Sequence, residues 1–358
     1  GAKNRTRWRA LVGKAGEQRY FPPVLESIPA MSQDAWLPYY KPLAGGQAAL
    51  RLVTFHWAGG SASAYNGTAW RDLPPGCELL AVQLPGREKR NDEPTPKTAQ
   101  EAAKLAAKGL SKFFAVGSVP TVIFAHSMGT WVAFEFVREL RRLKLQLPKL
   151  LLVSNLAAPQ TKVEARPWRR NAELSESQFK EECRAWGVNE IVMKDNFWKN
   201  FHHPFRRDFT IFDEYVYAAE EPLEVAIVAF LSAKDPKITT QLMTPWSEQT
   251  RHTASFEVVD FPGDHFYVQD RKIVPDLVKK ISEYLTKVKG GDFPPPLPPA
   301  EEETNASANG AGEFIQEDLV RKINLLEILE EDYPDVDPPP EDCVEKWTEQ
   351  EIRAHFTA

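Results

Sequence analysis

Six short apolar runs recur along the first 290 residues of the chain, and each ends in a turn of small or polar residues. They lie at 52–55, 78–83, 120–124, 149–154, 225–231 and 256–261. Short β-branched runs of this kind are typical of strands buried on both faces of a parallel sheet. Between or after several of them, apolar residues recur at the spacing of an α-helix, most clearly at 98–114, 131–143 and 273–287. The alternation predicts an α/β fold, with a mostly parallel central sheet and helices on both faces.

The alternation of strand and helix patterns is interrupted over residues 160–222. The stretch is rich in aromatic and charged residues and contains no clean strand pattern. We expect an amphipathic helical insertion, which would lie over the edge of the sheet where the strands end and form a lid. An ordinary pair of packing helices is the alternative.

Length and composition limit the class of protein. With 358 residues, of which 42% are hydrophobic and 11% aromatic, the chain fits one α/β domain with appendages. It has no run of about 18 apolar residues and no secretory signal, so no membrane span is expected. Cys77, Cys183 and Cys343 share no metal-ligand spacing, which indicates a reducing compartment and no metal site. We expect a cytoplasmic protein; import into an organelle, followed by removal of a transit peptide, stays open.

Composition also divides the chain into four segments. Residues 1–34 hold six basic and three acidic residues, which is more typical of a solvated extension than of a nucleic-acid-binding arm. The main domain spans 35–289, and a proline-rich, then flexible linker covers 290–313. Residues 314–358 form an acidic segment with one short helix expected at its start. Each extension is either a solvated tail or a docking segment for a partner.

One serine stands where a hydrolase would place its nucleophile. The strand at 120–124 runs into Ala125-His126-Ser127-Met128-Gly129, and a helical pattern follows at once. Strand, sharp turn and helix in this order make a nucleophile elbow, in which small residues two before and two after the serine let the turn close. Ala125 takes the place of the usual first glycine and adds one methyl group to a crowded turn.

An acid and a histidine follow later strands. Asp235 comes just after the strand at 225–231, and His265 lies in a glycine turn after the strand at 256–261. The chain order Ser127, Asp235, His265 is that of the α/β-hydrolases. The residues weighed against them are His126, His202 and His203 for the base, and Asp260 and Asp264 for the acid.

The loop after the first strand can supply an oxyanion hole. Its sequence, His56-Trp57-Ala58-Gly59-Gly60, is small and glycine-rich, so its backbone N–H groups can point at a ligand. We expect the N–H groups of Ala58 and Met128 to bind the oxyanion. A phosphate loop is excluded, because no Lys-Ser/Thr pair follows.

Several ordered blocks carry a resemblance to a known family. They are FHWAGGSASAY at 55–65, AVQLPGREKRNDEP at 81–94, FAHSMGTWVAFE at 124–135, HPFRRDFTIFDEY at 203–215, SAKDP at 232–236 and FPGDHFYV at 261–268. Over about residues 35–287 the chain resembles the type II thioesterases of polyketide, nonribosomal peptide and fatty-acid synthases, which belong to the α/β-hydrolase superfamily. It departs at His56, where the family usually has proline, and at Ala125 and Asp264, where it usually has glycine.

The resemblance implies an α/β-hydrolase fold with a helical lid, and a serine thioesterase that edits or releases acyl groups held on the phosphopantetheine arm of a carrier protein. Ser127 would attack the thioester, His265 would take its proton, and Asp235 would orient the imidazole. It implies an acyl or peptidyl carrier protein as the partner, no nucleic acid and no cofactor or metal. The candidates for substrate or carrier contacts are Trp57, Phe266, Arg206 and Arg207. An acyltransferase or esterase with the same triad, and a non-catalytic carrier-binding protein, are the alternatives.

Overall fold

The computed structural model describes residues 33–43, 48–292 and 347–357, together with positions 322, 326, 336, 337 and 339. The chain divides into two compact units, one of Ser32–Pro299 and one of Gly1–Met31 with Ala300–Ala358. The sheet and every predicted site residue belong to the first unit.

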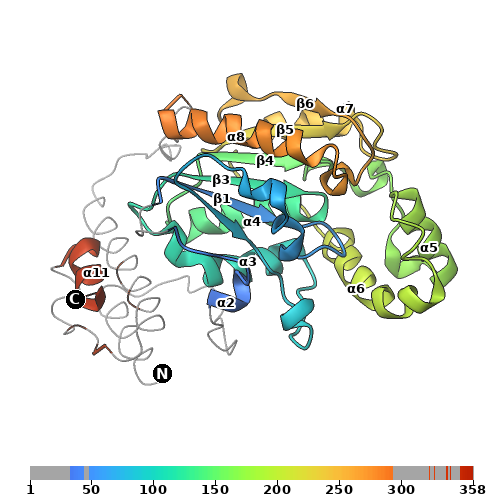
Figure 1. Ribbon diagram of the computed structural model, residues 1–358, viewed down its shortest axis with the longest axis horizontal. Helices are drawn as coiled ribbons and strands as arrows, with labels where there is room; N and C mark the ends of the chain where they lie inside the picture. Colours follow the sequence, from blue (N-terminus) through green and yellow to red (C-terminus); the bar gives the residue numbers. More distant parts are fainter. Residues whose placement is uncertain are drawn as a thin grey trace, which may run out of the picture. The chain divides into compact units, whose positions relative to one another are not determined.

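Six parallel strands form one sheet in the order β2-β1-β3-β4-β5-β6 (Figure 1). Every residue of β3, β4 and β5 is buried, which is why these strands read as continuous apolar runs. The predicted strands and the parallel sheet are therefore confirmed. The strands are β1 Leu50–Phe55, β2 Cys77–Ala81, β3 Thr121–His126, β4 Leu150–Ser154, β5 Ala226–Ser232 and β6 Val258–Phe261.

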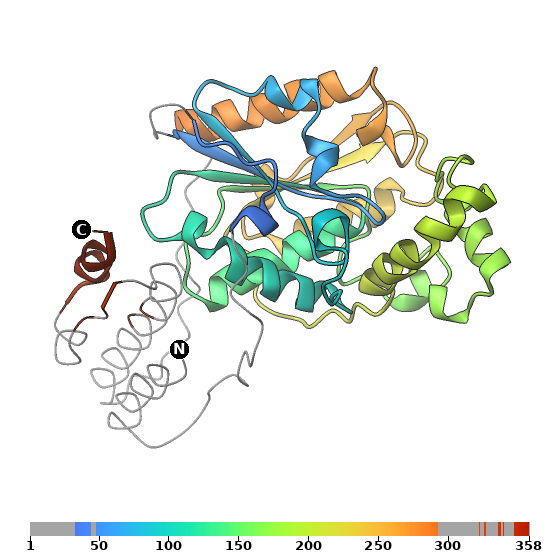
Figure 2. The same cartoon turned by 60° about the horizontal axis from the view of Figure 1, so that its bottom comes forward.

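Helices cover both faces of the sheet (Figures 1 and 2). On one face α3 (Ala99–Leu110) packs against α4 (Met128–Arg142), and α8 (Val274–Gly290) covers the other. Two short helices, α2 (Gln33–Trp36) and α7 (Thr240–Met243), complete this part of the fold. The arrangement agrees with the predicted α/β architecture.

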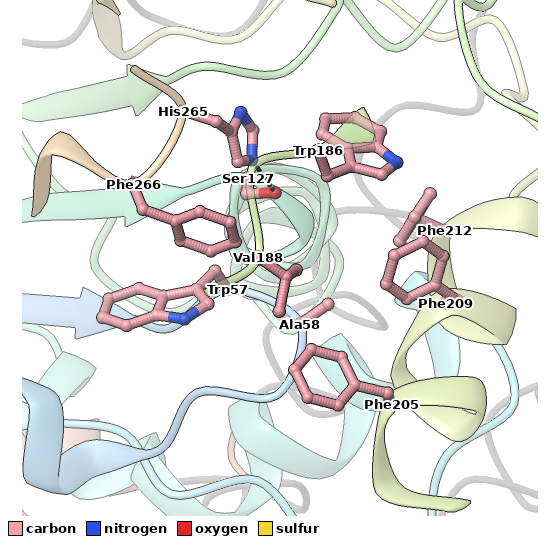
Figure 3. A pocket seen from close by; sticks show the side chains of 10 residues that line it. All are labelled: Trp57, Ala58, Ser127, Trp186, Val188, Phe205, Phe209, Phe212, His265 and Phe266. Carbon is pink, nitrogen blue, oxygen red and sulfur yellow. Dashed lines mark hydrogen bonds between the residues drawn. The ribbon is translucent and has the colours of Figure 1, made fainter. Parts of the chain in front are cut away.

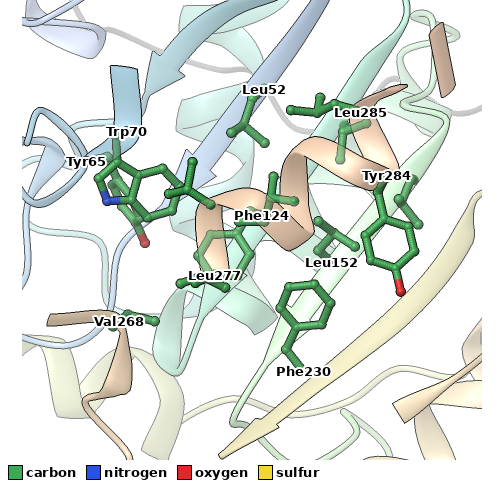
Figure 4. Packing of buried hydrophobic residues seen from close by; sticks show 14 of the residues in the cluster. Leu52, Tyr65, Trp70, Phe124, Leu152, Phe230, Val268, Leu277, Tyr284 and Leu285 are labelled. Carbon is green, nitrogen blue, oxygen red and sulfur yellow. The ribbon is translucent and has the colours of Figure 1, made fainter. Parts of the chain in front are cut away.

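The core beneath α8 is built from side chains of several strands. Leu52, Phe124 and Phe230 come from β1, β3 and β5, and they meet Leu277 and Leu285 of α8 (Figure 4). All five side chains are fully buried. Burial of apolar surface on this scale is the main term that holds the strands in register.

The predicted insertion over residues 160–222 is helical. Between β4 and β5 the chain forms two short 3₁₀ turns and then α5 (Glu176–Ala185) and α6 (Asp195–Asp213). Ser175 and Gln178 make a capping box at the start of α5, which satisfies two otherwise unpaired backbone N–H groups. Figures 1 and 2 show α5 and α6 beside each other at one end of the sheet. We call residues 160–222 the lid.

The second unit contributes one described helix, α11 (Glu349–Thr357). Thr348 begins it with a reciprocal cap: Thr348 Oγ1 accepts the N–H of Glu351, and the Glu351 carboxylate accepts the N–H of Thr348. The basic extension, the linker and the short helix predicted at the start of the acidic segment lie almost wholly outside the described residues. Within the described part of the chain, no helix is both long enough and apolar enough to cross a bilayer.

Candidate active site

Ser127 lies in the sharp turn between β3 and α4. Its backbone has φ 52° and ψ −130°, a region that non-glycine residues rarely occupy and that marks strain at functional sites. The Ser127 N–H donates to the carbonyl of Ser154 at 2.8 Å, and the Ser127 carbonyl accepts from the N–H of Thr130 at 2.8 Å. The turn thus fixes the serine at the N-terminal, positive end of α4.

Two small residues allow this turn. At Gly129 an added Cβ would lie 2.5 Å from the carbonyl oxygen of His56 and 2.7 Å from that of Phe55, so only glycine fits between α4 and β1. Ala125 pairs with Phe55 of β1 and Val153 of β4 and is buried. Its methyl group therefore projects from one face of the sheet into the buried interior, and the elbow accommodates it.

The predicted triad is assembled at the carboxyl ends of β3, β5 and β6. His265 Nε2 lies 2.9 Å from Ser127 Oγ, and His265 Nδ1 lies 2.6 Å from Asp235 Oδ2 (Figure 3 shows the first bond). A neutral imidazole with its proton on Nδ1 donates to the carboxylate and leaves Nε2 free to accept the serine proton. The His265 and Asp235 side chains are buried, so water does not compete for these bonds.

Asp235 is itself held by three further donors. Its Oδ1 accepts the N–H groups of Lys237 and Ile238 at 2.9 and 2.8 Å. Its Oδ2 accepts Asn155 Nδ2–H at 2.8 Å, and the side-chain Oδ1 of Asn155 accepts the N–H of Ser232 at 2.9 Å. The sequence analysis did not assign a role to Asn155. The signal for it was an asparagine directly after a buried strand, because asparagine tolerates the left-handed backbone that a sharp turn can require, and Asn155 has φ 46°.

The two predicted oxyanion donors lie on adjoining segments. Ala58 is in the loop after β1, and Met128 is the first residue of α4, where backbone N–H groups have no partner within the helix. Among the described residues, neither N–H donates to a backbone acceptor outside helices and strands. The tight contact at Gly129 brings the two segments together.

His126, one alternative base, belongs to the packing around the triad. It is buried in β3, and its Nδ1 lies 2.9 Å from Ser154 Oγ, which in turn lies 2.8 Å from the Tyr267 hydroxyl. Burial lowers the pKa of His126 well below its usual value. The ring is therefore neutral and supports His265, whose centroid is 5.1 Å away.

The remaining alternatives lie elsewhere. His202 and His203 are on the lid helix α6, where His202 Nε2 accepts from Arg206 at 3.1 Å. Asp260 is exposed on β6, and Asp264 is exposed and accepts the N–H of Phe266 within its own turn. The structure pairs His265 with Asp235 instead.

An apolar pocket adjoins Ser127 and His265 beneath the lid. Figure 3 shows its wall, to which α6 contributes three phenylalanines and the loop after β1 contributes Trp57 and Ala58. The cavity is only about 10 Å³, roughly the room for one water molecule, and Ser127 is 7% exposed. The lid is closed. The lining residues are Trp57, Ala58, Ser127, Trp186, Val188, Phe205, Phe209, Phe212, His265 and Phe266.

The other two predicted contact residues lie away from this pocket. Arg206 donates to the backbone carbonyls of Asn171 and Leu174 at 2.6 and 2.8 Å, so its guanidinium braces the lid. Arg207 is half-buried and its Nη1 lies near Gly86. Carrier contacts by either arginine stay a prediction.

No group of three or more His, Cys, Asp or Glu side chains that could hold a metal occurs among the described residues. Cys77 and Cys183 are buried and free, and burial raises the pKa of each thiol to about 12. Neither thiol is a reactive thiolate.

A parallel sheet with a serine, a histidine and an acid at its carboxyl edge defines the class: this is an α/β-hydrolase. Residues 50–285 match the thioesterase domain family. The chain belongs to the thioesterase family and is a thioester hydrolase.

Individual relatives agree with this assignment. The gramicidin S biosynthesis protein GrsT of Aneurinibacillus migulanus is 33% identical over 63% of this chain and 85% of its own length. The thioesterase PikA5 of Streptomyces venezuelae is 30% identical over 71% of this chain and 87% of its own. The solved structure of BorB, the type II thioesterase of the borrelidin biosynthetic cluster, matches with a TM-score of 0.60 and 30% identity, over 71% of this chain and 99% of BorB.

Proposed function

We propose that this protein hydrolyses acyl or peptidyl thioesters carried on the phosphopantetheine arm of a carrier protein, in editing or product release by a nonribosomal peptide or polyketide synthase. The observation that carries the proposal is the hydrogen-bonded line Ser127–His265–Asp235 beside an apolar pocket, in a chain of the thioesterase family. The biosynthetic context is supported by GrsT and BorB, which are named for gramicidin S biosynthesis and for the borrelidin biosynthetic cluster.

In the acylation half-reaction, Ser127 Oγ attacks the thioester carbonyl carbon while His265 Nε2 takes the hydroxyl proton. Asp235 keeps the Nδ1–H tautomer in place and stabilises the imidazolium that forms. The N–H groups of Ala58 and Met128 bind the oxyanion, each worth on the order of 3 kcal/mol in the transition state. The C–S bond then breaks, and the thiol leaves with the proton from Nε2.

In the deacylation half-reaction, water takes the place of the thiol. His265 removes a proton from the water as it attacks the acyl-serine, and returns the proton to Ser127 when the C–O bond breaks. The products are a carboxylic acid and the free phosphopantetheine thiol. In this proposal the enzyme uses no cofactor of its own, because the arm belongs to the substrate, and it acts in the cytoplasm.

The acyl chain and the carrier protein, at the two ends of the substrate, contact different parts of the enzyme. The aromatic wall accepts the acyl chain, and the carrier protein docks outside. We propose that Arg207, and Arg206 to the extent that its contacts within the lid allow, meet an acidic carrier. Charge reversal at Arg207 then raises KM for an acyl-carrier substrate and leaves KM for a small thioester unchanged; an equal effect on both substrates would contradict this role.

The test uses a panel of acyl-carrier thioesters with wild type and Ser127→Ala. Wild type is expected to release free acid, and the variant to lose at least about 10³-fold of that activity. Hydrolysis that survives Ser127→Ala rules the mechanism out. Adding alcohol and amine acceptors and analysing the products distinguishes a hydrolase from an acyltransferase with the same triad.

A further inference from the structure

A buried carboxylate of the lid reaches the loop that carries Ala58. Asp208, on α6, accepts the N–H of Gly59 through Oδ2 at 2.6 Å. The same carboxylate receives both prongs of the Arg87 guanidinium, Nη1 to Oδ2 at 2.9 Å and Nη2 to Oδ1 at 2.7 Å. Arg87 also donates to the carbonyl of Gly60 at 2.9 Å. One ion pair thus joins the lid, the loop after β1 and the loop after β2.

The bond to Gly59 fixes the peptide next to Ala58. The Gly60 N–H donates to the Trp57 carbonyl at 2.9 Å, and Gly59 has φ 76°, as in a type II turn with Ala58 at its second position. Asp208 holds the central peptide of that turn from outside. The Ala58 N–H belongs to the preceding peptide, so Asp208 acts on it by anchoring the turn as a whole. Without the bond from Gly59 and the link from Gly60 through Arg87, the turn is free to shift and to carry the Ala58 N–H away from the oxyanion.

The packing of Phe205 against Gly59 makes the bond from Gly59 to Asp208 depend on the position of α6. A Cβ on Gly59 would lie 2.7 Å from the ring of Phe205, one turn before Asp208 on α6. Phe205 also lines the pocket beside Ser127. The helix therefore rests directly on the turn, and α6 cannot lift away without breaking the bond from Gly59 to Asp208.

We propose that Asp208, paired with Arg87, is a positioning residue that orients the Ala58 N–H, so that the oxyanion hole is complete only when the lid helix is docked. This rests on the proposed function, because it takes the Ala58 N–H as an oxyanion donor. Asp208 touches neither the substrate nor the triad. Its effect on the rate is transmitted through Gly59.

The test compares Asp208→Ala with Asp213→Ala, using a small acyl-N-acetylcysteamine thioester that needs no carrier protein. Both residues lie on α6, both are buried, and Asp213 also accepts a backbone N–H, that of Asn171, but within the lid. The expected result is a loss of about 10²-fold in kcat for Asp208→Ala, in the range for an oxyanion donor, with KM within about threefold. Asp213→Ala is expected to keep kcat within about twofold.

Two further measurements keep the outcomes separate. Wild-type hydrolysis and its loss in Ser127→Ala test the proposed function on the same substrate, independently of Asp208. Asp208→Asn, which keeps an oxygen for Gly59 but loses the two-pronged ion pair, is expected to recover part of kcat and carries the test if the alanine variant does not fold. A folded Asp208→Ala with the kcat of Asp213→Ala, or with a change confined to KM, overturns the proposal.

Discussion

Asp213 makes the folding stability of the protein depend on pH. This carboxyl lies at the end of α6 and is 5% exposed. Its Oδ2 accepts the backbone and side-chain N–H groups of Asn171 at 2.7 and 2.8 Å. Burial raises the pKa of Asp213 to about 6, against the opposing effect of the Asn171 hydrogen bonds.

The sign and size of the effect follow from linkage. The folded state holds this proton more tightly than the unfolded chain, in which the pKa is 3.8. The resulting stabilisation is complete below the unfolded pKa and is lost as pH rises through the folded pKa. The difference between a pKa of 3.8 in the unfolded chain and about 6 in the folded protein corresponds to about 3 kcal/mol in all. Asparagine at this position has no proton to lose and keeps an oxygen for the N–H of Asn171.

Urea unfolding of wild type and Asp213→Asn from about pH 4 to pH 7 measures this directly. The free energy of unfolding of wild type minus that of the variant is expected to fall by about 2 kcal/mol across the range, because part of the effect lies below pH 4. Asp195→Asn, at the exposed start of the same helix with a side chain 92% exposed, is the control and should show no such slope. A difference for Asp213→Asn that stays constant with pH would refute the reasoning.

Three other changes give separate tests. Asn155→Ala removes the 2.8 Å bond to Asp235; since a hydrogen bond to a charged group contributes about 1.5–3 kcal/mol, kcat on a small thioester should fall about 10- to 100-fold with KM unchanged in steady-state kinetics. Gly129→Ala forces a Cβ to 2.5 Å from a backbone oxygen, so thermal unfolding should show a loss of about 1–3 kcal/mol or more. Arg138→Met leaves the buried carboxylate of Glu135, now 2.8 Å from the guanidinium, without its cation; urea unfolding should show a loss of about 3–5 kcal/mol, largely restored by adding Glu135→Leu.

The sheet and the triad could be predicted because each depends on a local pattern. A buried parallel strand is apolar along its whole length, and its last residue marks the edge where site residues gather. Ser127, Asp235 and His265 each follow such a strand, and their chain order selects the fold. The order of the strands was not predicted: β1 lies between β2 and β3, so two strands that follow each other in the sequence do not pair.

The contacts that support the triad could not be predicted in the same way. Arg87 and Asp208 are 121 residues apart, and nothing local in the sequence shows that a lid carboxylate meets a loop N–H. Arg206 could not be assigned for a different reason. Its charge is evident from the sequence, but the sequence does not show that the guanidinium binds backbone carbonyls of the lid. Sequence reasoning therefore took it for a surface cation.

The closed pocket and the contact between the lid and the turn at Gly59 together constrain how the enzyme selects substrates. The pocket beside Ser127 has room for about one water molecule in this conformation, so we expect α6 to shift when an acyl chain binds. Under the role proposed for Asp208, that movement also releases the Gly59 N–H and disorders the oxyanion hole. An acyl chain that lets α6 return is hydrolysed fast, and one that holds α6 away is hydrolysed slowly even when it binds well. Selection among acyl chains then appears in kcat more than in KM, because it acts on the transition state through the Ala58 N–H.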